Sequence, residues 1–181
     1  MPGPPLDNLP PGHRFADRYR VVRRLGDGHP GTVYQAVHEG LDQPVSLKVL
    51  TRVDAEPQEA SRFEREAAAL ARLNHPSCAE VMDYGVSDTA MFLALRYVTG
   101  PSLADEMTGR IAPLQALTLA LDLAEGLAHA HERGVVHRNL SPERVVLVND
   151  GGRRPRAKMV DFGLARLKQP DLDTTAGRDP V

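Results

Sequence analysis

The sequence changes character near Gly100, and this change limits the folds that the chain can adopt. Before that point, apolar and charged residues alternate at period two in RYRVVRRLG, a pattern typical of a half-buried strand. Further strands are expected at 32–38, 44–50, 79–85 and 90–98, with one helix at 59–73. After it we expect helices at 102–109 and 113–133 and a hairpin with strands at 144–148 and 157–160. This order predicts an α+β fold with a strand-rich first part and a mainly helical second part.

The composition argues against several classes of protein. A net charge of −2 offers no basic surface for nucleic acid. The apolar runs are too short to cross a bilayer, and residues 1–14 (MPGPPLDNLPPGHR) lack the basic start and apolar centre of a secretory signal. Cys78 is the only cysteine, which excludes an internal disulfide. We therefore expect a cytoplasmic protein with a disordered, proline-rich lead-in at 1–14.

A glycine-rich segment joins the first two predicted strands. Residues 26–33, GDGHPGTV, place Gly26, Gly28 and Gly31 at the spacing G-x-G-x-x-G, followed by Val33. Glycines at this spacing let backbone amides approach phosphate oxygens without Cβ clashes. Dinucleotide-binding folds share the spacing, but there it opens a helix, whereas a β-branched strand follows here. On this motif alone, a phosphate-binding turn and an ordinary glycine hairpin both remain open.

Lys48 ends the strand segment VSLK and is one of only three lysines among 22 basic residues. A strand lysine is usually an exposed surface residue. The distance from the glycine turn and a fitting acidic partner in the next helix favour a place in a site. We favour Glu66 over Glu59 and Glu64 as that partner, because Glu66 lies four residues before Leu70, on the side nearer the apolar stripe.

Three more segments follow in order: LALRYV at 93–98, HRNLSPERVVL at 137–147, and Asp161-Phe162-Gly163. Together with the glycine turn and Lys48, they resemble the Ser/Thr protein kinases, especially the bacterial eukaryotic-like type, over residues 19–166. The resemblance implies a protein-kinase-like α+β fold, with a five-stranded antiparallel N-lobe carrying one helix. This N-lobe would span 15–99, and an incomplete, mainly helical C-lobe would span 100–167.

The end of the sequence departs from the family. Residues 168–181 would form a truncated activation segment, because the sequence reaches Val181 before any A-P-E motif. The helix at 113–133 would then lose much of its packing surface and leave an apolar face bare. Thr174 and Thr175 lie where an activation segment carries phosphosites, and Arg138 is the cation with which a phosphate would pair. The alternative for this segment is a frayed tail.

The resemblance also implies the site residues. ATP would be the ligand; Lys48 would hold its α and β phosphates and pair with Glu66, and Asp161 would bind Mg²⁺. Leu95 would guard the pocket, and Arg96 and Val98 would offer main-chain contacts to adenine. The nucleotide-binding positions implied in full are Gly26, Gly28, Gly31, Val33, Lys48, Leu95, Arg96, Val98 and Arg144. Ser46, in place of the usual alanine, would put a hydroxyl over the ring. His137 and Phe162 would pack with Leu70, and a catalytic-base His137 is the alternative.

Three changes cluster in the catalytic loop. Asn139 stands where the family has its catalytic Asp, and an amide cannot serve as a proton-accepting base. Ser141 replaces the lysine at the γ-phosphate, and Arg144 replaces the second metal ligand. We hypothesise that Arg144 contacts phosphate directly and substitutes for that lysine and one metal ion. A single Mg²⁺ ion is then expected.

These changes favour a pseudokinase that binds ATP, with little or no phosphoryl transfer to protein Ser/Thr. Its candidate partners are ATP and a partner kinase or other protein, with no nucleic acid and no membrane segment. One alternative is a weakly active Ser/Thr protein kinase. The other is a non-functional, truncated kinase remnant.

Overall fold

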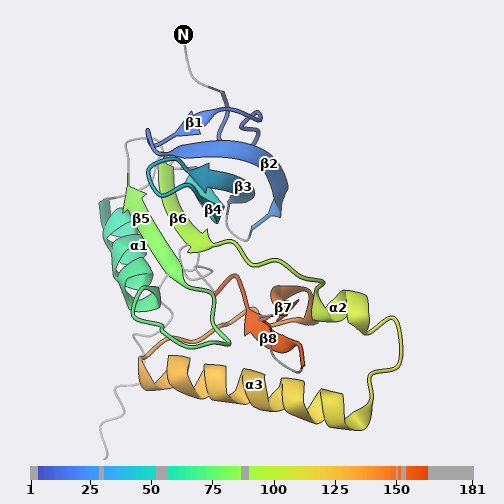
Figure 1. The fold of residues 1–181 in the computed structure, drawn as a ribbon. Helices are drawn as coiled ribbons and strands as arrows, with labels where there is room; N and C mark the ends of the chain where they lie inside the picture. Colours follow the sequence, from blue (N-terminus) through green and yellow to red (C-terminus); the bar gives the residue numbers. More distant parts are fainter. Residues whose placement is uncertain are drawn as a thin grey trace, which may run out of the picture.

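The structure, a computed structural model, describes residues 4–28, 31–51, 57–86, 90–149, 151 and 154–162. A curved antiparallel sheet forms the upper part of the molecule in Figure 1, with strand order β1-β2-β3-β4-β6-β5. Its strands are β1 (Arg14–Phe15), β2 (Tyr19–Asp27), β3 (Thr32–His38), β4 (Gln43–Thr51), β5 (Val81–Val86) and β6 (Ala90–Arg96). Five strands were predicted for the N-lobe, whereas the described residues form six. The additional strand is β1, which has only two residues.

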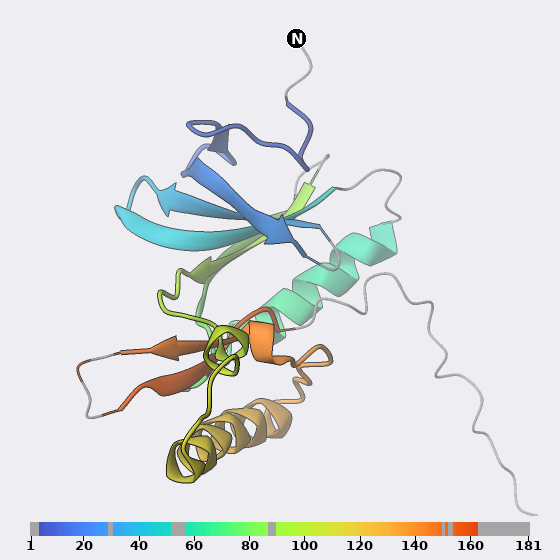
Figure 2. The same cartoon turned by 90° about the vertical axis from the view of Figure 1, so that its right-hand side faces the viewer.

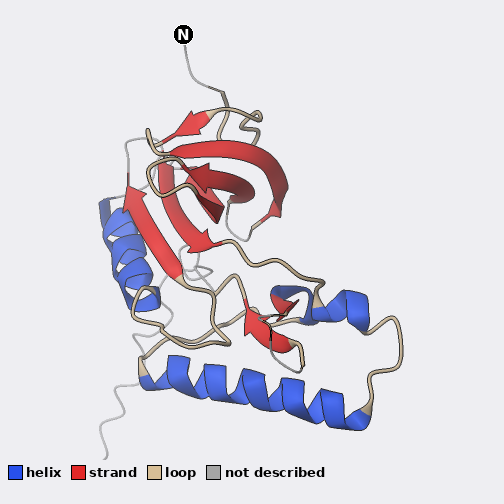
Figure 3. Ribbon diagram, viewed as in Figure 1, coloured by secondary structure: helices blue, strands red, loops and turns tan. Residues whose placement is uncertain are grey.

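One helix, α1 (Pro57–Leu70), packs against β5 and β6, as Figures 1 and 3 show. Its buried side includes Phe63, Ala67 and Leu70, which recur at the three- and four-residue spacing of a helix face. The predicted helix at 59–73 is thus found with both ends shifted by two or three residues. Leu73, placed on this face by the sequence, is buried just after the helix ends.

The prediction that the lead-in is disordered is wrong for residues 4–14, which are held on the sheet through Leu9. Leu9 is only 3% exposed and belongs to the core cluster under β2–β4. The Tyr34 hydroxyl accepts a hydrogen bond from the Leu9 N–H at 3.2 Å and donates one to the Leu6 carbonyl at 2.9 Å. The proline-rich composition indicated an extended chain but not the apolar residue that anchors it.

The second part contains α2 (Leu103–Glu106), α3 (Pro113–Glu132), a 3-10 turn at Pro142–Arg144, and the antiparallel hairpin β7 (Val145–Val148) and β8 (Arg156–Met159). The long helix α3 runs along the base of the molecule below this hairpin (Figures 1 and 2). No described helix is both long and apolar enough to cross a membrane.

The two sides of α3 differ in burial. Leu119, Asp122, Gly126 and Ala130 are buried toward the hairpin. Asp122 accepts two hydrogen bonds from Arg154, at 2.7 and 2.8 Å, and one from the Ala157 N–H. This charged anchor fixes the hairpin on the helix. The opposite side exposes three leucines, Leu114, Leu117 and Leu121, which are 74%, 67% and 56% exposed.

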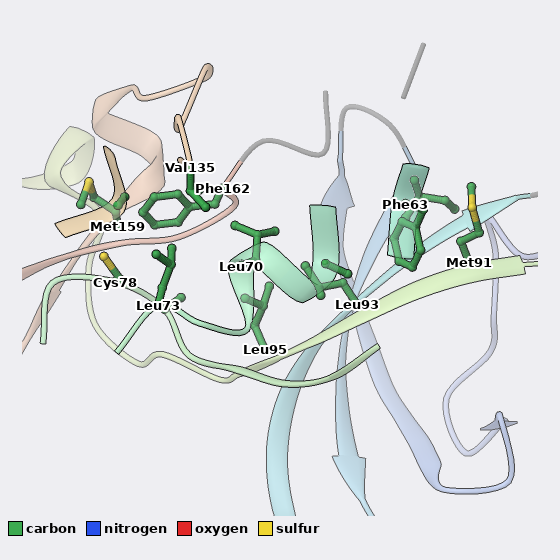
Figure 4. Packing of buried hydrophobic residues seen from close by; sticks show 14 residues of the cluster. Phe63, Leu70, Leu73, Cys78, Met91, Leu93, Leu95, Val135, Met159 and Phe162 are labelled. Atoms are coloured by element: carbon green, nitrogen blue, oxygen red, sulfur yellow. The ribbon is translucent and has the colours of Figure 1, made fainter. Parts of the chain in front are cut away.

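A single buried cluster joins the two parts of the chain. In Figure 4 it runs from Phe63 and Met91, under the sheet, to Val135, Met159 and Phe162 in the second part. Leu70, Leu93 and Leu95 lie between these ends, and Leu73 lies beside Cys78 at the second-part end. Since contiguous apolar packing holds both parts, the residues that face each other across the junction are fixed in position.

Candidate functional site

A cavity of about 310 Å³ lies at the junction of the sheet and the second part. This volume is at the lower end of the range for small-molecule sites. The described residues that line it come from the sheet and the segments before β5 and after β6, and from the 3-10 turn, the hairpin and the two residues after it: Leu25, Val33, Ser46, Lys48, Ala79, Leu95, Arg96, Tyr97, Val98, Glu143, Val146, Val160 and Asp161. Its walls are mostly apolar, and charged side chains lie at the Lys48–Asp161 end.

Strands β2 and β3, which flank the glycine-rich segment, border the cavity. The Gly28 N–H donates to the Gly31 carbonyl at 2.8 Å, and Leu25 and Val33 on the flanking strands line the cavity. Gly31 has φ +94°, and a Cβ there would lie 2.3 Å from the Val49 carbonyl oxygen. Position 31 therefore requires glycine for both conformation and space. Gly26, Gly28 and Gly31 are not among the lining residues of the cavity.

The segment after β6 forms the inner edge of the cavity. Leu95 lines it and also belongs to the core cluster, so its side chain separates the cavity from the core. The Arg96 guanidinium is directed toward Glu80 and Gln43, with contacts of 2.7 and 3.1 Å. The hydrogen bond from Arg96 holds the pKa of the Glu80 carboxyl below its usual value. The Arg96 N–H also donates to the Glu80 carbonyl at 2.8 Å, so both the side chain and the backbone of Arg96 are held against the segment before β5.

Three charged residues meet at the far end of the cavity. The Lys48 ammonium, with a side chain only 3% exposed, contacts Asp161 Oδ1 at 2.6 Å. Arg144 Nε donates to the other oxygen, Oδ2, at 3.2 Å, and its NH1 donates to Ser141 Oγ at 3.1 Å. A buried ammonium is stable only with a directly contacting carboxylate, and Asp161 supplies it.

The predicted ion pair between Lys48 and Glu66 is not the one found among the described residues. Glu66 Oε1 instead lies 4.0 Å from NH1 of Arg138, while Lys48 pairs with Asp161. Arg138 and Asp161 both have left-handed backbones, with φ of 61° and 57°. Such conformations cost free energy in non-glycine residues and gather at functional sites. Asp161 contacts Lys48 and Arg138 lies near Glu66, so the two residues that were expected to pair with each other have different partners.

The catalytic-loop segment places His137 in the core. His137 is 2% exposed, its ring lies 4.5 Å from that of Phe162, and its Nε2 lies 3.1 Å from the Val160 carbonyl. Burial lowers the pKa of His137, which favours a neutral ring that donates to Val160. These contacts fit the packing interpretation and not a base that faces a substrate. Asn139 follows in a tight turn, its N–H donating to the His137 carbonyl at 2.8 Å.

Six of the predicted site residues line the cavity together: Val33, Lys48, Leu95, Arg96, Val98 and Asp161. Asn139, Glu66 and Arg144 lie outside its lining, although Arg144 touches Asp161. The sequence reasoning missed Leu25, Ala79, Tyr97, Glu143, Val146 and Val160. Leu25 directly precedes the glycine-rich segment, and Val160 directly precedes Asp161. These neighbouring positions were the signal by which both could have been predicted as lining residues. Gly163, Thr174 and Thr175 lie outside the described residues.

An antiparallel sheet with one helix, set over a helical part with a lysine-lined cavity between them, is the architecture of the protein kinases. Residues 19–177 match the family model "Protein kinase domain". The chain belongs to the protein kinase family.

Its relatives are bacterial Ser/Thr kinases. The chain is 41% identical to "Serine/threonine-protein kinase pkn2" of Myxococcus xanthus, over 89% of the chain and 20% of that protein. It is 36% identical to PknI of Mycobacterium tuberculosis, over 94% of the chain and 30% of that protein. The crystal structure of the PknI kinase domain superposes with a TM-score of 0.67 at 35% identity, covering 86% of the chain and 62% of the solved domain. The chain thus spans under a third of these two curated relatives.

Proposed function

We propose that this chain is a pseudokinase-like module that binds ATP in the cavity and transfers little or no phosphate to protein Ser/Thr. The observation that carries the proposal is the asymmetry of the site. The cavity keeps a buried lysine in contact with the Asp161 carboxylate, whereas the catalytic loop has Asn139 and Arg144 at its two functional positions.

The binding half of the proposal rests on shape and charge. The apolar walls, from Val33, Ala79 and Val146, offer a slot suited to a flat ring. Val98, in the segment after Leu95, lines the cavity and is the proposed source of a main-chain contact to the ring edge, and Lys48 supplies a cation for phosphate. Ser46 adds a hydroxyl to this otherwise apolar wall.

The weak-transfer half rests on the catalytic loop. General base catalysis contributes about 10²–10⁴-fold, and Asn139 cannot provide it. Phosphoryl transfer otherwise depends on positioning and charge neutralisation. Ser141 brings no charge to the γ-phosphate position. Glu66 pairs with Arg138 and not with Lys48, so the ion pair on which kinase activity depends is not in place.

Protein kinases use ATP with Mg²⁺. Mg²⁺ prefers oxygen ligands, often one or two carboxylates with the substrate phosphates. Asp161 has the side chain for such a ligand, but a guanidinium occupies the second family position and contacts the same carboxylate. The proposal therefore includes one Mg²⁺ ion at most, at Asp161.

A transfer assay with radiolabelled ATP and a generic protein substrate tests the proposal. The unaltered chain, Asn139→Asp and Asp161→Ala are compared, together with a thermal-shift titration with ATP. We expect an ATP-dependent rise in Tm and transfer near the background of Asp161→Ala. Transfer by the unaltered chain that disappears in Asp161→Ala would identify a weakly active kinase. A Tm that does not change with ATP would refute the proposed ATP binding.

A further inference from the structure

Both carboxylate oxygens of Asp161 contact cations of the protein, Lys48 at Oδ1 and Arg144 at Oδ2. From this we infer that the site binds nucleotide as the metal-free polyanion, with the Arg144 guanidinium in the position of the divalent ion. The inference rests on the proposed nucleotide binding and specifies the form of the ligand: free ATP or ADP, not its magnesium complex.

Arg144 is held in place at both its backbone and its side chain. It ends the 3-10 turn Pro142–Arg144, where its N–H donates to the Ser141 carbonyl at 2.9 Å. The Arg144 carbonyl accepts a hydrogen bond from the Val160 N–H at 2.9 Å. Because Asp161 directly follows Val160, this bond holds the Arg144 backbone beside Asp161. With the NH1 contact to Ser141 Oγ, the guanidinium is anchored on two sides. About a quarter of the side chain remains exposed to solvent.

A divalent ion and Arg144 compete for the same oxygen. An ion bound to Asp161 Oδ2 would have to displace Arg144 Nε and then stay beside a guanidinium that does not lose its charge. Like charges at that separation repel strongly in a partly buried site. Asn, the residue of the family at this position, would supply an oxygen ligand and no charge.

The charges already present suit bare phosphates. Among the groups in direct contact, Lys48 and Arg144 carry two positive charges and Asp161 one negative, so this cluster has one positive charge in excess, with the Glu143 carboxylate of the cavity lining not counted. Guanidinium groups form paired hydrogen bonds with phosphate oxygens. A free polyphosphate offers its oxygens to both cations, whereas its magnesium complex brings a further cation to the carboxylate oxygen that Arg144 already contacts. Free nucleotide is therefore the better matched ligand.

The experiment is calorimetric titration of the full chain with ATP, once in excess EDTA and once in excess Mg²⁺, for the unaltered chain and Arg144→Asn. For the unaltered chain we expect dissociation constants within about threefold of each other, or tighter in EDTA. Arg144→Asn loses the resident charge and gains a metal ligand. Its affinity in EDTA should fall by about tenfold or more, and Mg²⁺ should restore it.

Two controls separate the contributions. Arg144→Lys keeps the charge without the planar fork and should retain metal-independent binding with reduced affinity. Glu132→Gln removes an exposed carboxylate on α3, outside the cavity lining, and should leave the response to Mg²⁺ unchanged. Binding by the unaltered chain only in Mg²⁺ overturns the inference while leaving the proposed nucleotide binding intact. Equal affinity of Arg144→Asn and the unaltered chain in EDTA also overturns it. No heat in either buffer refutes the proposed nucleotide binding itself.

Discussion

The ammonium of Lys48 and the carboxylate of Asp161, 113 positions apart in the sequence, are in contact at 2.6 Å. Lys48 comes from β4 in the centre of the sheet, and Asp161 follows β8 in the second part. The contact therefore closes the inner end of the cavity from both sides. It also leaves Asp161 paired with a cation if Lys48 is removed, because Arg144 contacts the other oxygen.

Lys48→Ala should abolish most ATP binding and leave the chain folded. The loss of a buried charge-assisted contact to phosphate should weaken the affinity by about tenfold or more. Asp161 keeps its contact with Arg144, so it is not left as an isolated charge. Thermal-shift titration with ATP measures the change. Lys158→Ala, a strand lysine outside the cavity lining, is the matched control and should respond to ATP like the unaltered chain.

Gly31→Ala should destabilise the sheet more than Gly12→Ala. Both positions have left-handed φ, +94° and +84°, so both substitutions carry a strain of about 1–2 kcal/mol. Only at Gly31 would the added Cβ meet another atom, the Val49 carbonyl oxygen at 2.3 Å; nothing lies within 4 Å of the Cβ at Gly12. Chemical unfolding of the two variants compares them. Equal free energies of unfolding would mean that the turn moves to accommodate the methyl group.

The sequence was sufficient for the order of elements and for the residues of the cavity that come from motifs. Strand alternation and helical spacing report local burial, so the sheet, α1, α3 and the hairpin were predictable within a few residues. Lys48 and Asp161 were predictable because a motif fixes each one. The apolar lining from Ala79, Tyr97 and Val146 was not, because the composition of such a wall differs little from that of any buried strand or loop.

The pairing of charges was less predictable than the identity of the charged residues. The resemblance implied that Lys48 would pair with Glu66, but Lys48 contacts Asp161 and Glu66 lies near Arg138, and both of these partners have left-handed backbones. Backbone conformation of this kind leaves no pattern in a single sequence. The prediction of a disordered lead-in failed for a related reason, because the segment is anchored by two single contacts, the buried Leu9 side chain and the Tyr34 hydroxyl.

Tyr34→Phe should loosen the lead-in. The Tyr34 hydroxyl accepts from the Leu9 N–H and donates to the Leu6 carbonyl, and Tyr34 is fully buried. Removing the hydroxyl leaves the amide of a buried residue without this acceptor, at a cost of about 1–3 kcal/mol. We expect a lower Tm and faster proteolysis within residues 4–14. Tyr97→Phe is the control, because the Tyr97 hydroxyl makes an exposed 3.4 Å contact with Arg23 and its loss should matter little. Unchanged proteolysis of Tyr34→Phe would show that Leu9 packing alone holds the segment.

Asp122→Asn should destabilise the chain at neutral pH, and the difference should disappear in acid. The hydrogen bonds from Arg154 hold the pKa of Asp122 below its usual value, with a smaller contribution from the Ala157 N–H. A depressed carboxyl pKa stabilises the fold above the unfolded-state value, about 3.8, and this contribution is lost as the pH falls through the folded-state value. We expect a loss of about 1–3 kcal/mol at pH 7, measured by thermal or chemical unfolding. The gap from the unaltered chain should narrow progressively below about pH 4. Glu132→Gln, an exposed acid on the same helix, should cost under about 0.5 kcal/mol at pH 7. A gap for Asp122→Asn that stays constant down to pH 2 would mean that the carboxylate charge does not anchor the hairpin to α3.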